Sequence, residues 1–393
     1  MRYSISSPAG EFSIEADDLS LVARGGVADV FKDSFSNFAY KIFKDATVAE
    51  WEKIDFQIEN PVDSDTGNAD AALNFAWPVG LIYSENSRVG IVLPLIDLSS
   101  FISLDNWVES HLLDRLEDDN NSLGRRIPML ANLARILARL HRKGHAVIDL
   151  KPTNILVNRL TADVCLIDCD SFSIKSETQI FAPTHVSAGY IAPEALGEEI
   201  DVAVLDKHQD LFAFAAIAFQ ILNYGLHPFQ GILENGSIAD TTDDKAEKGF
   251  YAYGVDPNEN IRPLPQSVQN QWPTQLRRLF DRAFTQSTNR PSARVWGTFF
   301  NKLLSEKKLR PCDAHPTDPR HIRFEDCECM VCHRNLELKS AQMRHTVEAS
   351  NREEHLRERI PTSPAEEGPN FGGLILFLLA VAAIIFAAVL GSS

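Results

Sequence analysis

The chain has little positive charge and few cysteines, and its first eighteen residues contain no long apolar run. Only 38 basic residues face 54 acidic ones among 393, so the surface as a whole should repel a nucleic-acid backbone, and nucleic acid is not an expected partner. The first eighteen residues contain no basic region followed by an apolar core, so no secretory signal is expected. Four of the six cysteines fall between 312 and 332. This clustering indicates a reduced compartment and metal binding rather than a disulfide framework.

One long apolar run is present near the end of the chain. Residues 371–390 carry no charge, and at 1.5 Å per residue a helix of this length spans about 30 Å, the thickness of a bilayer core. The run follows a polar linker, so a transmembrane helix is preferred over a buried core helix. We expect a single-pass protein of the cell membrane, with 391–393 across the bilayer and the preceding domains facing the cytoplasm. The shorter run at 211–222 predicts a buried helix.

The pattern of apolar residues changes along the chain. Strand-like segments dominate 1–45 and 75–97, with one helical stretch between them. Helical periodicity follows, beginning with a leucine-patterned segment that Gly144 should terminate. We therefore predict an α+β fold in five parts: a β-rich region at 1–97, an α-rich region at 98–308, a Cys/His module at 309–335, a charged juxtamembrane linker at 336–370 and a transmembrane helix at 371–390.

Four side chains occur in an order that suits phosphoryl transfer. This chemistry needs a cation near the phosphates, oxygen ligands for Mg²⁺ and an aligned acceptor hydroxyl. Lys41 lies in an apolar strand, Asp149 and Asn154 follow the leucine-patterned helix, and Asp168 ends another apolar strand. Taken singly, Lys41 would more often be a surface lysine and Asp168 an ordinary polar turn. The spacing and order of all four favour the chemical interpretation.

From about residue 20 to 305 the sequence resembles the protein kinase-like superfamily. The resemblance rests on the Asp149 to Asn154 spacing, on Ala192-Pro193-Glu194 and on Asp210 at the start of the apolar helix. It implies a bilobal fold, with a β-rich N-lobe and an α-rich C-lobe, that uses ATP with Mg²⁺ or Mn²⁺. Asp210 would brace the catalytic loop, and Arg290 would pair with Glu194. These architectural elements favour a protein kinase over a kinase of small metabolites.

The same resemblance implies roles for individual residues. Asp149 would accept the proton of the acceptor hydroxyl, and Lys151 would steady the transferring phosphate, as in Ser/Thr-type kinases. Lys41 would reach the α and β phosphates, and Asn154 and Asp168 would hold the metal. Autophosphorylation is among the expected reactions, and the protein substrate is unknown.

A glutamate on the helix after Lys41 should form an ion pair with it. The stretch offers three candidates, Glu50, Glu52 and Glu59. Glu52 is preferred, although any of the three could belong to a solvated helix face.

Three departures from the family pattern bear on activity. Aligned on Val30, the phosphate loop keeps only its middle glycine, Gly25, with Gly26 beside it, so a weaker or differently shaped nucleotide cradle is expected. Val147 and Ile148 replace the usual His-Arg pair, which argues against control by activation-loop phosphorylation. Asp170 stands where the metal-binding turn normally has glycine, and could stiffen that turn.

The cysteine-rich segment suggests zinc. Cys312-x-x-His315 and Cys329-x-x-Cys332 form two chelating pairs separated by thirteen residues, a spacing typical of structural tetrahedral zinc. His321, Cys327 and His333 are further candidate ligands, and the alternative is a metal-free loop. The sequence is similar to a bacterial group that joins a kinase domain to a C-terminal Cys/His module. The similarity rests on three fragments followed by this segment: "GHAVIDLKPTNILV", "LIDCDSF" and "HPF". Some of its members carry helix-hairpin-helix DNA-binding repeats, whose signature this sequence lacks.

Two functional hypotheses follow. The preferred one is a membrane-anchored, ATP-dependent protein kinase, with Ser/Thr acceptors favoured over Tyr. The alternative is a catalytically weak pseudokinase scaffold that binds nucleotide and assembles partners at a membrane, in keeping with the altered phosphate loop.

Overall fold

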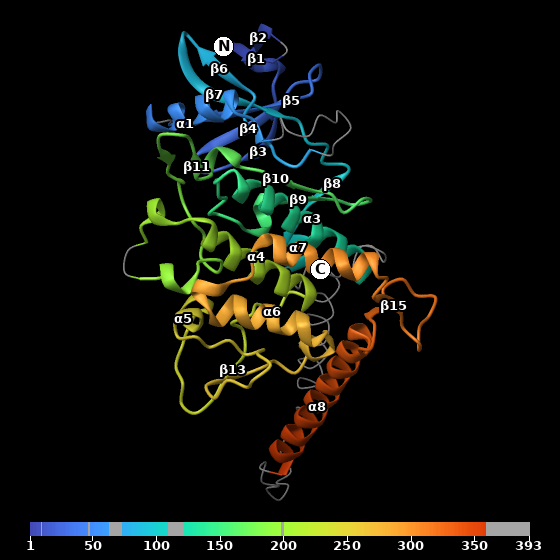
Figure 1. Ribbon diagram of the computed structural model, residues 1–393. Helices are drawn as coiled ribbons and strands as arrows, with labels where there is room; N and C mark the ends of the chain where they lie inside the picture. The colour runs from blue at the N-terminus through green and yellow to red at the C-terminus, as the bar shows by residue number, and fades with distance from the viewer. Residues whose placement is uncertain (9, 46–47, 63–72, 109–121, 198–199, 359–393) are drawn as a thin grey trace, which may run out of the picture. The chain divides into compact units, whose positions relative to one another are not determined.

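The computed structural model describes residues 1–8, 10–45, 48–62, 73–108, 122–197 and 200–358. The chain divides into two compact units, 1–338 and 339–393. The first unit contains a sheet-rich N-lobe followed by a helix-rich C-lobe (Figure 1). The predicted bilobal α+β fold is therefore present. The boundaries proposed within it, at 97/98, 308/309 and 335/336, stay predictions.

The N-lobe is built on one antiparallel sheet of seven strands. The strand order is β2-β1-β6-β7-β5-β4-β3, and the helix α1 (Val48–Glu59) lies between β5 and β6 in the chain. Strand β5 pairs with β4 on one side and β7 on the other, which places Lys41 opposite both Val30 and Ile91. A central strand has limited freedom, so the backbone of Lys41 is held from both sides. The strands are β1 (Arg2–Ser7), β2 (Gly10–Glu15), β3 (Ser20–Arg24), β4 (Ala28–Lys32), β5 (Phe38–Phe43), β6 (Gly80–Ser84) and β7 (Ser87–Pro94).

The C-lobe is organised around two long helices, α3 (Leu123–Arg142) and α4 (Lys207–Leu222). Helix α3 has the predicted leucine face, with Leu130, Leu133, Leu137 and Leu140 all buried. It stops where expected, because Gly144 takes the left-handed conformation with φ of +83°. Helix α4 is buried along almost its whole length, which explains its all-round apolar sequence.

The remaining elements of the C-lobe are shorter. Helices α6 and α7 bury one amphipathic face each, including Phe280 and Trp296, in the same core as α3 and α4. The elements are β8 (Phe101–Ser103), α2 (Asp105–Val108), β9 (Ile155–Asn158), β10 (Val164–Leu166), β11 (Ile174–Lys175), β12 (Ile180–Phe181), β13 (Ile232–Leu233), α5 (Thr242–Glu247), β14 (Ile261–Arg262), α6 (Thr274–Thr285) and α7 (Ala293–Ser305).

The Cys/His segment consists of a two-stranded ribbon and the start of a helix. Strands β15 (Leu309–Pro311) and β16 (Ile322–Phe324) are antiparallel, and α8 (Met330–Glu358) follows. Phe324 and Met330 belong to the core cluster of the C-lobe, and the Trp272 indole nitrogen lies 3.1 Å from the Met330 sulfur. The segment is thus packed onto the C-lobe rather than tethered to it.

Part of the region predicted to be a charged linker is helical. Residues 336–358 are helical, as part of α8. The physical reason is composition, because Glu, Arg, Lys, Gln and Ala favour helix and no Gly or Pro interrupts them before Pro361. Within the described residues no helix has the length and apolar character needed to cross a membrane. The apolar run at 371–390 lies outside those residues.

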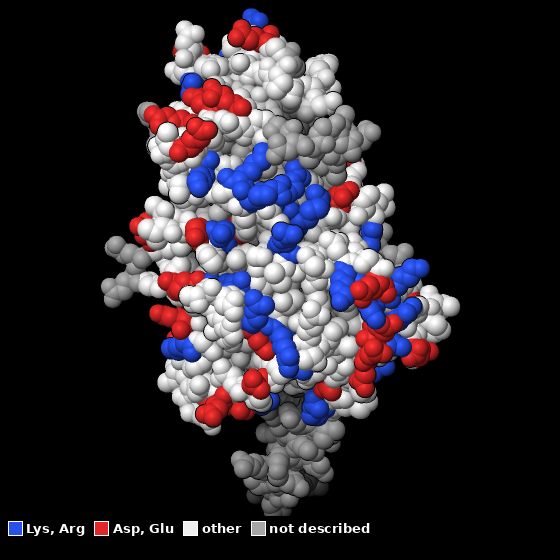
Figure 2. All heavy atoms as spheres, in the orientation of Figure 1, with Lys and Arg blue, Asp and Glu red and all other residues white. Residues whose placement is uncertain are grey.

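The acidic net charge is not spread evenly. A groove of about 1390 Å³ is lined by α3, α7 and the first turn of α4, and its basic side chains include Arg135, Arg142, Arg294 and Lys302. Figure 2 shows basic side chains gathered over the region where Figure 1 places α3 and α7. The groove is a local exception to the charge predicted from composition.

Candidate active site

Lys41 and Asp168 meet where the sheet of the N-lobe faces the turn after β10. The Lys41 Nζ atom lies 2.5 Å from Asp168 Oδ1, across 127 residues of sequence. It also lies 2.7 Å from both carboxylate oxygens of Asp170. The ammonium is buried, and although burial alone would lower the pKa of Lys41, the two carboxylates raise it above its usual range. Lys41 is therefore charged and held by two anions.

The catalytic loop gathers around Asp149. Its Oδ2 atom lies 2.7 Å from Lys151 Nζ and 3.0 Å from His185 Nε2, and it accepts a hydrogen bond from Asn154 Nδ2 at 3.2 Å. Burial opposes ionisation, yet hydrogen bonds from His185, Lys151 and Ser187 lower the pKa of Asp149 to about 2. Among the described residues, Oδ1 of Asp149 is buried and has no hydrogen-bond partner. The loop thus holds an ionised carboxylate with one oxygen left to accept a proton donor.

Asp210 supports this loop from beneath, as the sequence suggested. Its carboxylate, at the start of α4, accepts hydrogen bonds from the backbone N–H groups of Val147 and Ile148 at 2.8 and 2.7 Å. His141 Nε2 lies 2.8 Å away. Val147 and Ile148, which replace the usual His-Arg pair, are both buried. The loop is therefore positioned through its backbone, and needs no arginine there.

The donor set near Asp168 fits a hard divalent cation. Asn154 donates through Nδ2 to both the backbone oxygen and Oδ2 of Asp149, so the group it can offer a cation is the amide oxygen. Its backbone oxygen also accepts from the Ile167 N–H at 3.0 Å, which ties the catalytic loop to the residue before Asp168. Asp168 is 30% exposed. Amide and carboxylate oxygens are the ligands that Mg²⁺ prefers, so these residues could hold it.

The expected phosphate loop is a short hairpin turn between β3 and β4. The Gly25 N–H donates to the Ala28 oxygen at 3.0 Å, and a Cβ atom at Gly25 would come within 2.8 Å of that oxygen. Glycine is therefore required at this position, whereas Gly26 has open space around it. Val30 follows in β4, directly across from Lys41. The turn has fewer glycines than the family pattern has.

The expected pairing of Lys41 with Glu52 is wrong. Glu52 is exposed on α1, and the side chains that α1 buries against the site are Lys53 and Gln57. Lys53 donates to the backbone oxygen of Ala182 at 3.2 Å and Gln57 to that of Cys169 at 2.8 Å. The helix is rotated so that a lysine and an amide face inward, and no spacing rule could predict that rotation. Burial lowers the pKa of Lys53 to about 8, although Asp170 partly opposes this.

Glu194 and Arg290 come together as predicted. The Arg290 guanidinium binds the carboxylate with two nitrogens, one of them 2.7 Å from Glu194 Oε2. Arg290 is buried, and it also donates to the Ala283 backbone oxygen at 3.0 Å. Although partial burial opposes it, this bidentate pair lowers the pKa of Glu194. The end of the activation segment is thereby fixed to the C-lobe.

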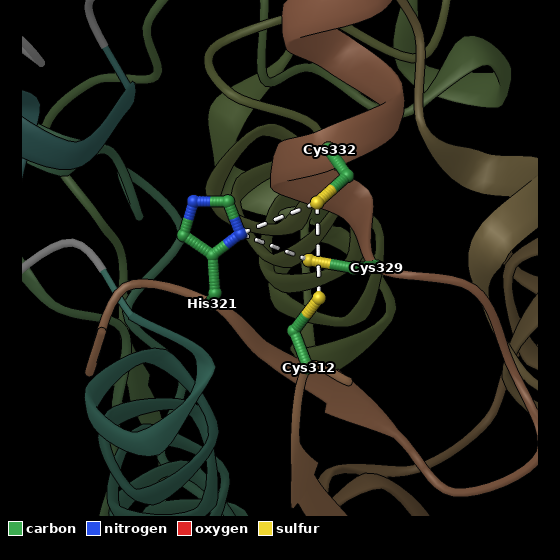
Figure 3. Close-up of side chains that lie close together, drawn as sticks. All are labelled: Cys312, His321, Cys329 and Cys332. Carbon is green, nitrogen blue, oxygen red and sulfur yellow. Dashed lines mark hydrogen bonds between the residues drawn. The ribbon is translucent and has the colours of Figure 1, made fainter. Parts of the chain in front are cut away.

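Four potential metal ligands converge in the Cys/His segment. The ligand atoms of Cys312, His321, Cys329 and Cys332 all lie within 4.8 Å of one another. Figure 3 shows His321 Nδ1 facing the sulfurs of Cys329 and Cys332, which lie 3.5 and 3.4 Å away. The Cys312 sulfur lies 3.7 Å from that of Cys332. All six cysteines of the chain are free. Three thiols and one imidazole are a donor set that fits structural zinc.

His315 does not belong to this cluster, contrary to the expectation from spacing. It is exposed, and its ring lies 4.2 Å from that of His321, centre to centre. The antiparallel ribbon explains why His321, and not His315, belongs to the cluster. Strand β15 ends at Pro311, which lies opposite Ile322 at the start of β16. Just beyond these two residues, the Cys312 N–H donates to the backbone oxygen of His321 at 2.7 Å. The cross-strand neighbour therefore supplies the imidazole, and the residue three positions along the chain does not.

Sequence reasoning also missed His185 and Lys53. His185 comes from the activation segment and reaches Asp149, and Lys53 reaches the segment after Asp168. Both contacts join residues that are far apart in sequence, and neither residue lies in a motif. The charged residue at 170 was visible as a departure from the family pattern, but its contact with Lys41 was not.

Comparison with known proteins agrees with this geometry. Residues 83–295, more than half of the chain, match the model of the protein kinase domain. The protein kinase YegI of Escherichia coli (strain K12) is 28% identical over 204 residues, covering 50% of this chain and 31% of YegI. The serine/threonine-protein kinase 16 of Rattus norvegicus is 29% identical over 136 residues, covering 32% of this chain and 44% of that protein.

A third relative is the serine/threonine-protein kinase pkn2 of Myxococcus xanthus, 30% identical over 119 residues, which cover 30% of this chain and 14% of pkn2. The chain thus matches less than half the length of each of these relatives. The matched region contains the catalytic loop, Asp168, the Glu194–Arg290 pair and Asp210, whose positions the structure has shown to be mutually supporting. The chain belongs to the protein kinase family.

Proposed function

We propose that this chain is an ATP-dependent protein kinase that transfers the γ-phosphate of ATP to serine or threonine hydroxyls. The observation that carries the proposal is the meeting of Lys41 with Asp168, beside a catalytic loop in which Asp149 keeps an unpartnered oxygen. A buried carboxylate oxygen without a partner is costly unless a ligand supplies one. An acceptor hydroxyl would supply it once the side chains that cover Oδ1 have moved aside.

Each residue has a definite task in this reaction. Lys41 binds the α and β phosphates of ATP. Asn154 and Asp168 would hold Mg²⁺ or Mn²⁺, which supplies charge neutralisation between the phosphates. Most of the rate enhancement in such a reaction comes from positioning and electrostatics. The ionised side chains here are already fixed by hydrogen bonds before substrate arrives.

Asp149 acts mainly by orientation. A carboxyl group with a pKa of about 2 is a weak base. Its unpartnered Oδ1 would accept the hydrogen bond of the attacking hydroxyl, fix the direction of that oxygen and receive its proton late in the transfer. Lys151 stays close enough to offset the charge of the moving phosphoryl group.

The preference for Ser and Thr rests on Lys151 and on the relatives. Lys151 Nζ lies 2.8 Å from the Ser187 hydroxyl, so it joins the catalytic loop to the activation segment. Two relatives of this region carry the name serine/threonine-protein kinase.

Label transfer from ATP tests the proposal. The full chain, purified in detergent, would be incubated with γ-labelled ATP, Mg²⁺ or Mn²⁺ and a Ser/Thr-rich protein acceptor. Asp149→Asn and Asp168→Asn should each reduce transfer by about 100-fold or more, because each removes a group that acts in the transition state. Asp17→Asn, at an exposed site in the N-lobe, is the matched control and should leave transfer unchanged. Undiminished transfer in both site variants would overturn the proposal.

A scaffold with weak or no turnover is the second candidate. The observation that favours it is the phosphate turn, which has one required glycine, Gly25, where the family pattern has three. Under this alternative ATP would raise the thermal unfolding temperature of the full chain, and no label would leave the nucleotide.

Two further assignments complete the proposal. Cys312, His321, Cys329 and Cys332 would hold a structural zinc ion, a site without an open position for catalysis. The apolar run at 371–390 would anchor the chain in the cell membrane with the kinase domain facing the cytoplasm, where ATP is available. Arg352, Arg357 and Arg359, on the N-terminal side of that run, agree with this orientation.

A further inference from the structure

We propose that Asp170 is the positioning residue that holds Lys41 in its phosphate-binding orientation, in place of a glutamate from helix α1. Asp170 occupies the position where the metal-binding turn of the family pattern has glycine. The inference deepens the proposed kinase function and rests on it. It is carried by the geometry of one short turn.

The contact between the two side chains is direct and shielded from water. Both oxygens of Asp170 lie 2.7 Å from Lys41 Nζ, and the two side chains are each 11% exposed. A charge-assisted contact of this kind is much stronger in a buried site than on a surface. Asp170 is thus the better shielded of the two carboxylates that touch Lys41, because Asp168 is 30% exposed.

The two carboxylates would bind different groups once a metal ion is present. Asp168, if it held a divalent cation, would no longer serve Lys41 as its main counter-ion. Asp170 then remains to hold the ammonium. In this arrangement one turn supplies the metal ligand and the anchor of the phosphate-binding lysine.

The turn is built to keep Asp170 in place. Residues Cys169–Ser171 form a 3-10 helix, a right-handed conformation that needs no glycine at 170. The left-handed residue is Asp168, with φ of +61°, which aspartate tolerates better than most side chains do. Ser171 stabilises the turn, since its hydroxyl donates to the backbone oxygen of Asp168 at 2.7 Å. Cys169 is fully buried.

Helix α1 has a different task from the one expected. Its buried residues Lys53 and Gln57 are donors, and they contact the backbone oxygens of Cys169, Phe172 and Ala182. A second cation on this face would repel Lys41 if it were not compensated. Asp170 lies near both lysines, which accounts for its influence on the pKa of each. Helix α1 therefore holds the turn, and the turn holds Lys41.

A double-mutant cycle on unfolding tests the pairing without requiring catalysis. The full chain would carry Lys41→Met, Asp170→Asn or both, and chemical denaturation would be followed in detergent. The two substitutions should be non-additive by about threefold or more in the unfolding equilibrium constant. The same cycle with Lys41→Met and Glu52→Gln, the matched control, should be additive. Additivity for Asp170, or equal coupling for Glu52, would overturn the inference.

Steady-state kinetics separates anchoring from metal binding. Asp170→Asn should lower kcat by about tenfold or more, because a misplaced lysine loses its contact in the transition state. The Mg²⁺ concentration for half-maximal rate should stay within about twofold, whereas Asp168→Asn should raise it. Asp170→Glu, which keeps the carboxylate, should recover part of the lost kcat. A raised Mg²⁺ requirement in Asp170→Asn would make Asp170 a metal ligand and overturn its anchoring role. If the parent chain transfers no phosphate, the proposed function fails and the cycle still decides the pairing.

Discussion

The carboxylate of Asp210 accepts a hydrogen bond from the backbone N–H of Ile148 at 2.7 Å, and Ile148 has a φ of +65°. Isoleucine is β-branched, so the left-handed conformation is strained, by about 1–2 kcal/mol. The strain persists because a buried helix supplies the acceptor. The residue before Asp149 is therefore held in its unusual conformation by a group more than sixty positions away in sequence.

Asp210→Asn should destabilise the protein. An amide has one acceptor oxygen, so it cannot satisfy the N–H groups of Val147 and Ile148 and the His141 ring together. We expect a loss of about 2–4 kcal/mol in the free energy of unfolding, measured by chemical denaturation. Asp17→Asn, at an exposed site, should change stability by less than about 0.5 kcal/mol. Equal stability of the two variants would show that Asp210 does not brace the loop.

His185 should make the activity depend on pH. The Asp149 carboxylate raises the pKa of His185 above 6.5, and Asp168 adds to this while Lys151 opposes it. The pair is fully formed below pH 6.5 and is lost as pH rises through the higher folded value. The pKa of Asp149 is lowered, so its own contribution is lost only as pH falls from 3.8 through about 2. As pH rises above 6.5, the group in contact with Asp149 that loses its proton is therefore the histidine.

We expect kcat/KM to rise over that range as the imidazolium releases Asp149. His185→Gln should flatten the acid side of the profile, whereas His315→Gln, at an exposed site, should not alter it. The measurement is the pH dependence of label transfer by the full chain. An unchanged profile in His185→Gln would exclude this role for His185.

Zinc content should follow His321 and not His315. The purified full chain should contain about one zinc ion, measured by elemental mass spectrometry. Cys312→Ser and His321→Ala should lose it, because each removes a member of the four-residue cluster. The unfolding temperature should then fall by several degrees, since the ribbon packs on the C-lobe through Phe324. His315→Ala is the matched control and should keep its zinc. If His315→Ala lost zinc and His321→Ala kept it, the ligand set suggested by spacing, with His315, would be the correct one.

Removal of residues 371–393 should release the protein from membranes. Twenty uncharged residues are enough to cross a bilayer. The full chain should sediment with membranes after an alkaline wash, and the shortened chain should stay in the supernatant. Removal of 391–393 alone is the control, and should leave the protein with the membranes. Recovery of the full chain in the supernatant would contradict the anchoring proposal.

Local patterns predicted much of this molecule. The leucine spacing of α3, the left-handed Gly144 and the buried α4 all follow from periodicity and backbone preference. Motif spacing and order also indicated Lys41, Asp149, Asn154 and Asp168 as candidate site residues. The strand content of the N-lobe was also legible, although the order of its strands was not.

What could not be predicted depends on contacts between distant segments. Three glutamates of α1 were compatible with an ion pair, but only packing decides which face of a twelve-residue helix turns inward. Spacing favoured His315, whereas the cross-strand register placed His321 next to Cys312. In both cases the residue that matters is close in space and is not marked by sequence spacing.

Helix α1 recognises the segment after Asp168 through carbonyl oxygens, which every residue carries. Lys53 donates to the backbone oxygens of Phe172 and Ala182, and Gln57 donates to that of Cys169. The residues on the two sides of this contact should consequently tolerate substitution to different degrees. The contact depends on the side chains at positions 53 and 57 of the helix, whereas position 182 contributes only its backbone oxygen.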